Sequence, residues 1–117
     1  MLATKIGKFL YRNKVTEKRT HRDAELWVVS SILGGAQFGG QTIGECIFAL
    51  PLEANDPDIM RHEYIHVKQW RRLGSIGFPV RYFWEFISNY LKLVFSGYKG
   101  DKRMEAYRNI SLEKEAG

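Results

Sequence analysis

NDPDIMRHEYIHVKQWRRLG, residues 55–74, contains the signals for both ends of one helix. Asp56 is a residue type that caps helix N-termini, and Pro57 suits the first helical position, where its missing N–H would have no partner anyway. Gly74 is the residue type that ends helices, and the arginines just before it suit the negative end of the helix dipole. These signals predict a helix over residues 57–73.

This predicted helix carries the pattern H-E-x-x-H. His62 and His66 are four residues apart, so they lie on one helix face and both imidazoles can bind one metal ion. Glu63 projects beside them, where it can take a proton from a metal-bound water. The alternative is a chance match, with two core or surface histidines beside a solvated glutamate.

The composition predicts one globular domain over residues 1–117. The chain is 44% hydrophobic, which excludes a disordered protein, and its single cysteine excludes an internal disulfide and any multi-cysteine zinc site. Cys46 lies in a strand-like run, so we expect a buried, unreactive thiol. The first ten residues lack the apolar core of a signal peptide, and we expect a cytoplasmic protein.

The chain is basic, and its positive charge is concentrated near the N-terminus. The net charge is +5, and seven basic residues fall within the first 22: Lys5, Lys8, Arg12, Lys14, Lys18, Arg19 and Arg22. Such a patch can bind nucleic acid or anionic lipid, but it is more often a solvated face. Because no recognised nucleic-acid module accompanies it, we expect no nucleic-acid partner.

The segment from Ile76 to Phe95 is the most apolar of the chain. It does not read as a membrane span, because polar or charged residues recur along it at helical spacing: Arg81, Glu85, Asn89 and Lys92. We expect an amphipathic helix over residues 76–96 that packs an aromatic stripe inward, comprising Tyr82, Phe86, Tyr90 and Phe95. Peripheral contact with a membrane surface, or with a partner, is the alternative use of that stripe.

The remaining segments predict an α+β domain in which a small sheet of about two strands lies beside a helical bundle, in the order α-β-β-α-α-α. The expected elements are a helix (2–13), a loop (16–23), a strand (25–33), a glycine-rich hairpin-type connection (34–40), a strand (41–50), a loop (51–55), the two helices above, and a last helix (102–114).

A catalytic zinc ion needs a third protein ligand and keeps a fourth position for water. No histidine follows His66, which excludes signatures that place a third histidine shortly downstream. The residue types leave several candidates open, namely His21 upstream and the carboxylates of Glu85, Asp101, Glu105, Glu113 and Glu115 downstream.

The chain resembles the minigluzincins, soluble minimal metallopeptidases similar to the catalytic domains of integral-membrane gluzincins. The resemblance covers residues 41–109 and rests on four stretches: Gln41-Thr42-Ile43-Gly44, His62 to Trp70, Gly97-Tyr98 and Met104-Glu105-Ala106-Tyr107. It implies a zincin-like fold and a Zn²⁺ ion bound by His62, His66 and Glu105. It places Asn109 where such proteins often have an acidic residue that orients a histidine.

The resemblance also implies hydrolysis of peptides or unfolded proteins, with Glu63 as the general base. An oxyanion partner is expected from Tyr98, Tyr107 or His21, and the segment from Ile43 to Phe48 is a candidate edge for an extended substrate. Two alternatives remain open. One is a zinc-binding domain that is inactive, or latent because a carboxylate of residues 111–117 occupies the open metal position. The other is a basic membrane-surface or nucleic-acid-binding module with an accidental motif. No oligomeric state is predicted.

Overall fold

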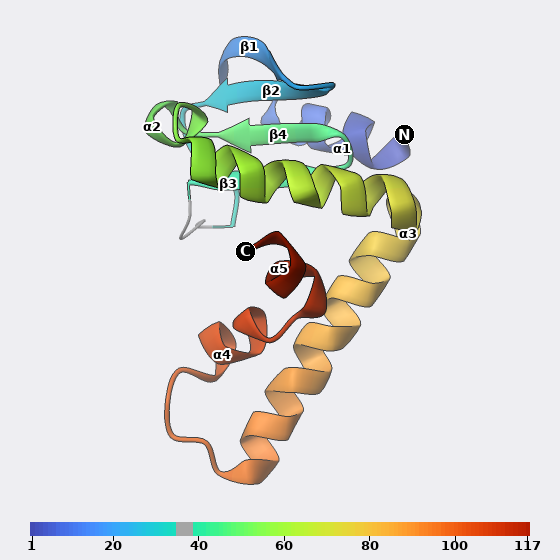
Figure 1. The fold of residues 1–117 in the computed structure, drawn as a ribbon, viewed down its shortest axis with the longest axis vertical. Coiled ribbons are helices and arrows are strands. Elements are labelled where there is room, and N and C mark those ends of the chain that lie inside the picture. The colour runs from blue at the N-terminus through green and yellow to red at the C-terminus, as the bar shows by residue number, and fades with distance from the viewer. Residues whose placement is uncertain (35–38) are drawn as a thin grey trace.

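The computed structural model describes residues 1–34 and 39–117 and has an α+β architecture, with a small sheet and a mostly helical part (Figure 1). Its elements in chain order are α1 (Leu2–Tyr11), β1 (Val15–His21), β2 (Ala24–Val29), β3 (Gly40–Ile43), β4 (Cys46–Ala49), α2 (Pro51–Ala54), α3 (Pro57–Ser96), α4 (Lys102–Arg108) and α5 (Ser111–Ala116).

The sheet has four strands in the order β1-β2-β4-β3, so the expectation of about two strands was wrong. β1 and β2 form an antiparallel hairpin, β2 and β4 are parallel, and β3 and β4 are antiparallel. β1 falls where a loop was expected over residues 16–23. The middle residues of β1, 16–20, are exposed on both faces, as an edge strand allows. β1 therefore lacks the alternation of apolar and polar residues that marks a half-buried strand.

The glycine-rich connection does not close a hairpin, because β4 lies between β2 and β3 in the sheet. Its residues 35–38 lie outside the described residues. The run expected as one strand over residues 41–50 is instead two strands joined at Gly44-Glu45. Gly44 has φ +64°, and a Cβ there would lie 2.5 Å from the backbone nitrogen of Thr4. This close approach of α1 requires a glycine.

α3 is two helices joined by a kink at Gly74. The cap predicted for its start is confirmed, because Asp56 Oδ1 accepts hydrogen bonds from the backbone N–H groups of Asp58 and Ile59 at 2.9 and 3.3 Å. Gly74 has φ 83° and ψ 175°, so the predicted break is confirmed too. The chain resumes its helix at once, and the second half of α3 runs away from the sheet (Figure 1).

The sheet is covered on both faces. The first half of α3 packs on one face through a buried cluster that includes Leu26, Val28, Ile47, Met60 and Val67. The cluster on the other face, beside α1, includes Tyr11, Trp27, Phe48 and Cys46. Cys46 is buried as expected, and burial raises the pKa of its thiol to about 12, which disfavours the reactive thiolate.

The second half of α3 packs on α4 and α5 through Phe78, Tyr82 and Phe86, which lie with buried Ile110 and Leu112. The inward stripe predicted from the sequence is wrong at Phe95, which is 85% exposed. None of the described helices is both long and apolar enough to cross a bilayer.

Candidate metal centre

Three side chains meet where α5 lies beside the first half of α3 (Figure 1). His62 Nε2 and His66 Nε2 are 3.2 Å apart, and each lies 3.1 Å from the same carboxylate oxygen, Oε1 of Glu113. Among the described residues these three form the one group of histidine, cysteine and acidic side chains with metal-ligand spacing.

The donor set fits a zinc ion. Tetrahedral zinc with bonds of about 2.0–2.1 Å holds its ligand atoms about 3.3 Å apart, close to the three distances above. The side chains of His66 and Glu113 are 7% and 8% exposed, and that of His62 is 30% exposed. Two imidazoles and one carboxylate are the ligands of many catalytic zinc sites, which leave one position for water.

Gln69 orients His66. Its amide nitrogen donates to the backbone oxygen of Leu112 at 2.9 Å, which directs Oε1 of the same amide towards His66 Nδ1 at 2.8 Å. Because that oxygen can only accept, Nδ1 carries a proton, and loss of the proton on Nε2 leaves the Nε2 lone pair for a metal. Gln69 is 1% exposed, so one buried amide both sets the tautomer of His66 and ties α5 to α3.

The Glu113 carboxylate is held at both oxygens. Oε1 faces the two histidines, and Oε2 accepts a hydrogen bond from the Tyr82 hydroxyl at 2.8 Å. Burial alone would raise the pKa of Glu113, but hydrogen bonds from His62 and His66 outweigh it and lower that pKa. Burial would likewise lower the pKa of His66, and the hydrogen bond and charge of Glu113 raise it instead. An anionic carboxylate is the form that binds a metal.

Glu63 lies beside the cluster without joining it. Its side chain is almost fully buried, and its Oε1 accepts a hydrogen bond from the Thr42 hydroxyl at 2.8 Å. Burial raises the pKa of Glu63, which moves this carboxylate towards the range where a group both accepts and donates protons near neutral pH.

The cluster opens onto a cavity of about 850 Å³. Glu63, His66 and Glu113 line it together, so the candidate base and two metal-binding groups face one space. Its other walls include β3 residues, the second half of α3 and α4, with Trp70, Phe78, Tyr82, Met104 and Tyr107 among the lining side chains. A cavity of this size and mixed lining is typical of a ligand site.

The structure does not bring Glu105 to the histidines. Its Oε1 accepts a hydrogen bond from Asn109 Nδ2 at 3.1 Å, and its Oε2 lies 3.8 Å from Arg108. Asn109 therefore binds Glu105 and does not orient a histidine. Glu113, which stood among the open candidates, is the carboxylate that lies beside the two histidines at metal-ligand spacing.

The other open candidates have different roles. Asp101 caps α4, and Glu85 accepts a hydrogen bond from Ser111. Glu115 accepts from the Gln69 amide at 2.9 Å, so it supports the site from outside. His21 ends β1 and packs edge-on against Tyr64, with its Nε2 buried and without a hydrogen-bond partner among the described residues.

Of the three candidate oxyanion partners, Tyr107 is the one that lines the cavity within the part of the chain that the structure describes. Burial, followed by the charge of Glu113, raises the pKa of Tyr107, so it remains a protonated donor. Tyr98 instead is 38% exposed and lies over Gly100.

Gln69 and Tyr82 were missed as site residues. Gln69 had a detectable signal, because it follows His66 by three residues and is a polar residue on the buried helix face, next to Trp70. Tyr82 had none, since it was assigned to an apolar stripe and its contact with Glu113 spans 31 residues.

Comparison with protein-family models, with curated proteins and with solved structures gives no match. The minigluzincin resemblance and the zincin-like fold therefore stay predictions, and the functional argument rests on the geometry of the site.

Proposed function

We propose that this chain is a zinc-dependent metallopeptidase in which His62, His66 and Glu113 hold the ion and Glu63 is the general base. The observation that carries the proposal is the shared cavity. A glutamate with a raised pKa and two of the three metal-binding side chains line one space large enough for a segment of polypeptide. A buried structural metal site would need neither the base nor the opening.

Each residue has a defined task. A zinc ion at this site supplies a Lewis acid that polarises a carbonyl and lowers the pKa of bound water to about 7. Glu63 accepts the proton of the attacking water and passes it to the leaving amine, while the Thr42 hydroxyl keeps the carboxylate aimed. Tyr107, whose hydroxyl is hydrogen-bonded to Glu113, would transfer that hydrogen bond to the oxygen that gains negative charge.

The substrate is an extended peptide or an unfolded protein. β3 lines the cavity and, among the described strands, has a neighbour on one side only. An added peptide strand can pair with its other edge. This refines the edge expected from the sequence over residues 43–48, because β4 is an interior strand.

The test is the replacement Glu63→Gln, which keeps the shape and the hydrogen bond from Thr42 but removes the base. We expect zinc content to stay at one ion per chain and hydrolysis of an unstructured protein to fall by about 10²-fold or more. Glu17→Gln, on the exposed edge strand β1, is the matched control and should keep full activity. Equal activity in Glu63→Gln and the control would refute this mechanism.

A second candidate, a zinc-binding domain that is latent or inactive, is favoured by the position of Glu113. This residue belongs to α5, the last described helix. Its carboxylate is therefore also placed to block the metal position at the two histidines, and we call this second role a plug. A ligand and a plug differ when Glu113 is removed. Loss of a ligand lowers zinc affinity, whereas loss of a plug leaves zinc bound and raises activity.

A further inference from the structure

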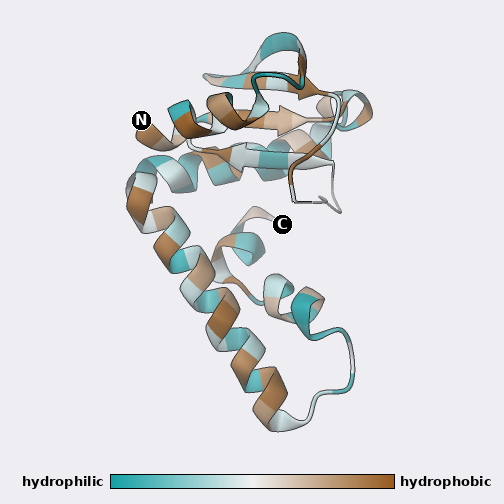
Figure 2. Ribbon diagram, turned by 180° about the vertical axis from the view of Figure 1, so that it is seen from behind, coloured by the Kyte–Doolittle hydropathy of each residue, from teal (hydrophilic) through white to brown (hydrophobic). Residues whose placement is uncertain are grey.

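A second apolar surface lies on the half of α3 that leaves the sheet. We call it the arm stripe, and most of its members recur at intervals of three or four residues: Ile76, Val80, Phe83, Trp84, Ile87, Leu91, Val94 and Phe95. All are exposed, Trp84 to 70% and Phe95 to 85%. They lie opposite Phe78 and Tyr82, which pack towards α5. Apolar residues therefore line this second half of α3, here called the arm, along its length (Figure 2).

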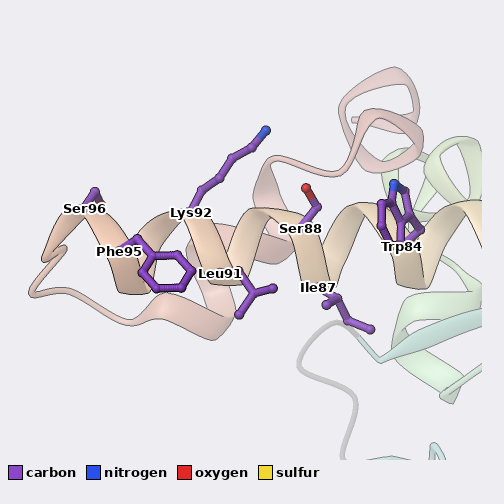
Figure 3. A pocket seen from close by; sticks show the side chains of 7 residues that line it. All are labelled: Trp84, Ile87, Ser88, Leu91, Lys92, Phe95 and Ser96. Atoms are coloured by element: carbon purple, nitrogen blue, oxygen red, sulfur yellow. The ribbon is translucent and has the colours of Figure 1, made fainter.

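The stripe is too large to be an ordinary solvated face. Single exposed apolar residues are common in proteins, but eight large ones over five helical turns form a contiguous patch, which marks an interaction surface. Trp84, Ile87, Leu91 and Phe95 also line a shallow groove along the helix together with Lys92 (Figure 3).

The charged residues in the sequence around the end of the arm are mainly basic. Residues 86–103 contain four basic side chains, Lys92, Lys99, Lys102 and Arg103, and one acidic residue, Asp101. The Asp101 carboxylate is engaged in capping α4, where it accepts from the backbone N–H groups of Arg103 and Met104. A partner that complements this surface is therefore apolar where it meets the stripe and negatively charged where it meets Lys92, which lines the groove.

We propose that the arm stripe docks on a membrane that contains anionic lipid. The helix lies in the plane of the interface, with its aromatic rings at headgroup depth and its lysines against the lipid phosphates. A second copy of the chain fits less well, because pairing two arms would bring together two surfaces in which basic residues outnumber acidic ones. α1 adds a further basic helix with exposed apolar residues, namely Leu2, Ile6, Phe9 and Leu10.

Vesicle binding tests this proposal without reference to peptidase activity. The full chain is mixed with vesicles of phosphatidylcholine and phosphatidylglycerol, or of phosphatidylcholine alone, and bound protein is measured by sedimentation. We expect binding to the anionic vesicles that weakens as salt is added. Trp84→Ser and Phe95→Ser should each weaken it by about tenfold or more. Lys92→Gln and Lys99→Gln should each weaken it by about fivefold.

Leu52→Ser is the matched control, because Leu52 is 83% exposed but lies on α2, far from the arm in the fold. Trp84 is also a built-in probe, since Trp27 and Trp70 are buried at 7% and 6% exposure. Its emission should shift to the blue on anionic vesicles, and Trp84→Phe should bind without that shift. Absence of binding, equal loss in Leu52→Ser, or concentration-dependent dimers that Trp84→Ser abolishes without any vesicle binding would overturn the proposal.

Discussion

Removing Glu113 should weaken zinc binding far more than removing Glu105. The structure places Glu113 Oε1 3.1 Å from both histidine nitrogens, whereas the Glu105 carboxylate bonds to Asn109. The two residues lie on neighbouring short helices, and both are partly or fully buried. Glu105→Ala is thus a matched control for Glu113→Ala.

The magnitude follows from the number of ligands. Zinc bound by four protein ligands has an apparent binding free energy of about 10–16 kcal/mol, or about 3 kcal/mol for each ligand. Loss of one ligand therefore corresponds to about 10²-fold in affinity, at 1.4 kcal/mol for each factor of ten. Glu105→Ala should change the affinity by less than about threefold, because its removal leaves all three donor atoms in place.

The assay is competition of each variant with a chelating dye of known zinc affinity, together with elemental analysis and peptidase activity. Three results are distinguishable. Loss of zinc and of activity in Glu113→Ala identifies a ligand. Zinc retained with increased activity identifies a plug, and then a third ligand must be sought elsewhere. Loss of zinc in Glu105→Ala but not in Glu113→Ala would refute the assignment drawn from the structure and support the ligand set implied by the resemblance.

Three further predictions concern the support of the site and the fold. Tyr82→Phe removes the hydrogen bond to Glu113 Oε2 and should weaken zinc binding by about 10–100-fold in the same dye assay, whereas Tyr90→Phe on the same helix should not. The next prediction concerns the stability of the metal-free fold, measured with a chelator present. The raised pKa of His66 contributes stability that is complete below pH 6.5 and is lost as the pH rises through the folded pKa. The lowered pKa of Glu113 contributes stability that is complete above pH 4.5 and is lost as the pH falls through the folded pKa. Denaturant titrations should therefore show that the metal-free protein is most stable between pH 4.5 and 6.5. The stabilisation by added zinc should increase above pH 6.5. A metal-free stability that keeps rising from pH 6.5 to 8 would contradict this. Gly74→Ala should destabilise the fold by about 1–3 kcal/mol, because a backbone with φ 83° and ψ 175° is open almost to glycine alone. Gly77→Ala, within the helix, should instead stabilise the fold. Changes of the same sign in the unfolding free energies of the two variants would disprove the strain argument.

The features predicted correctly from the sequence depend on neighbours in the chain. The Asp56 cap and the break at Gly74 follow from backbone rules that act over one helical turn. The pairing of His62 with His66 follows from the helical period, and the structure places their Nε2 atoms 3.2 Å apart. In each case, nothing outside the segment is needed to fix the geometry.

The features that were missed depend on distant contacts. β1 was taken for a loop because a polar edge strand exists only through its pairing with β2. Phe95 was placed inward because apolar residues lie on two sides of this amphipathic helix, and the sequence does not reveal which of the two is covered. The ligand set implied by the resemblance contained Glu105 and not Glu113, and a residue near a terminus often lies in a frayed segment. Here Ile110 and Leu112, at 0% and 1% exposure, anchor the segment in the core instead.

The position of Glu113 indicates that the fold and the proposed metal site would stabilise the same segment. α5 has six residues, too few for a helix that is stable alone, so it is held by what it buries and binds. Leu112 supplies the apolar contact, and the Gln69 amide, which orients His66, donates to the Leu112 backbone oxygen. An ion bound to Glu113 adds a further link between α5 and α3, worth about 2.7 kcal/mol when zinc is at 100 times its dissociation constant. Hydrophobic burial thus places the third candidate donor atom, and a bound metal would in turn stabilise the packing that places it.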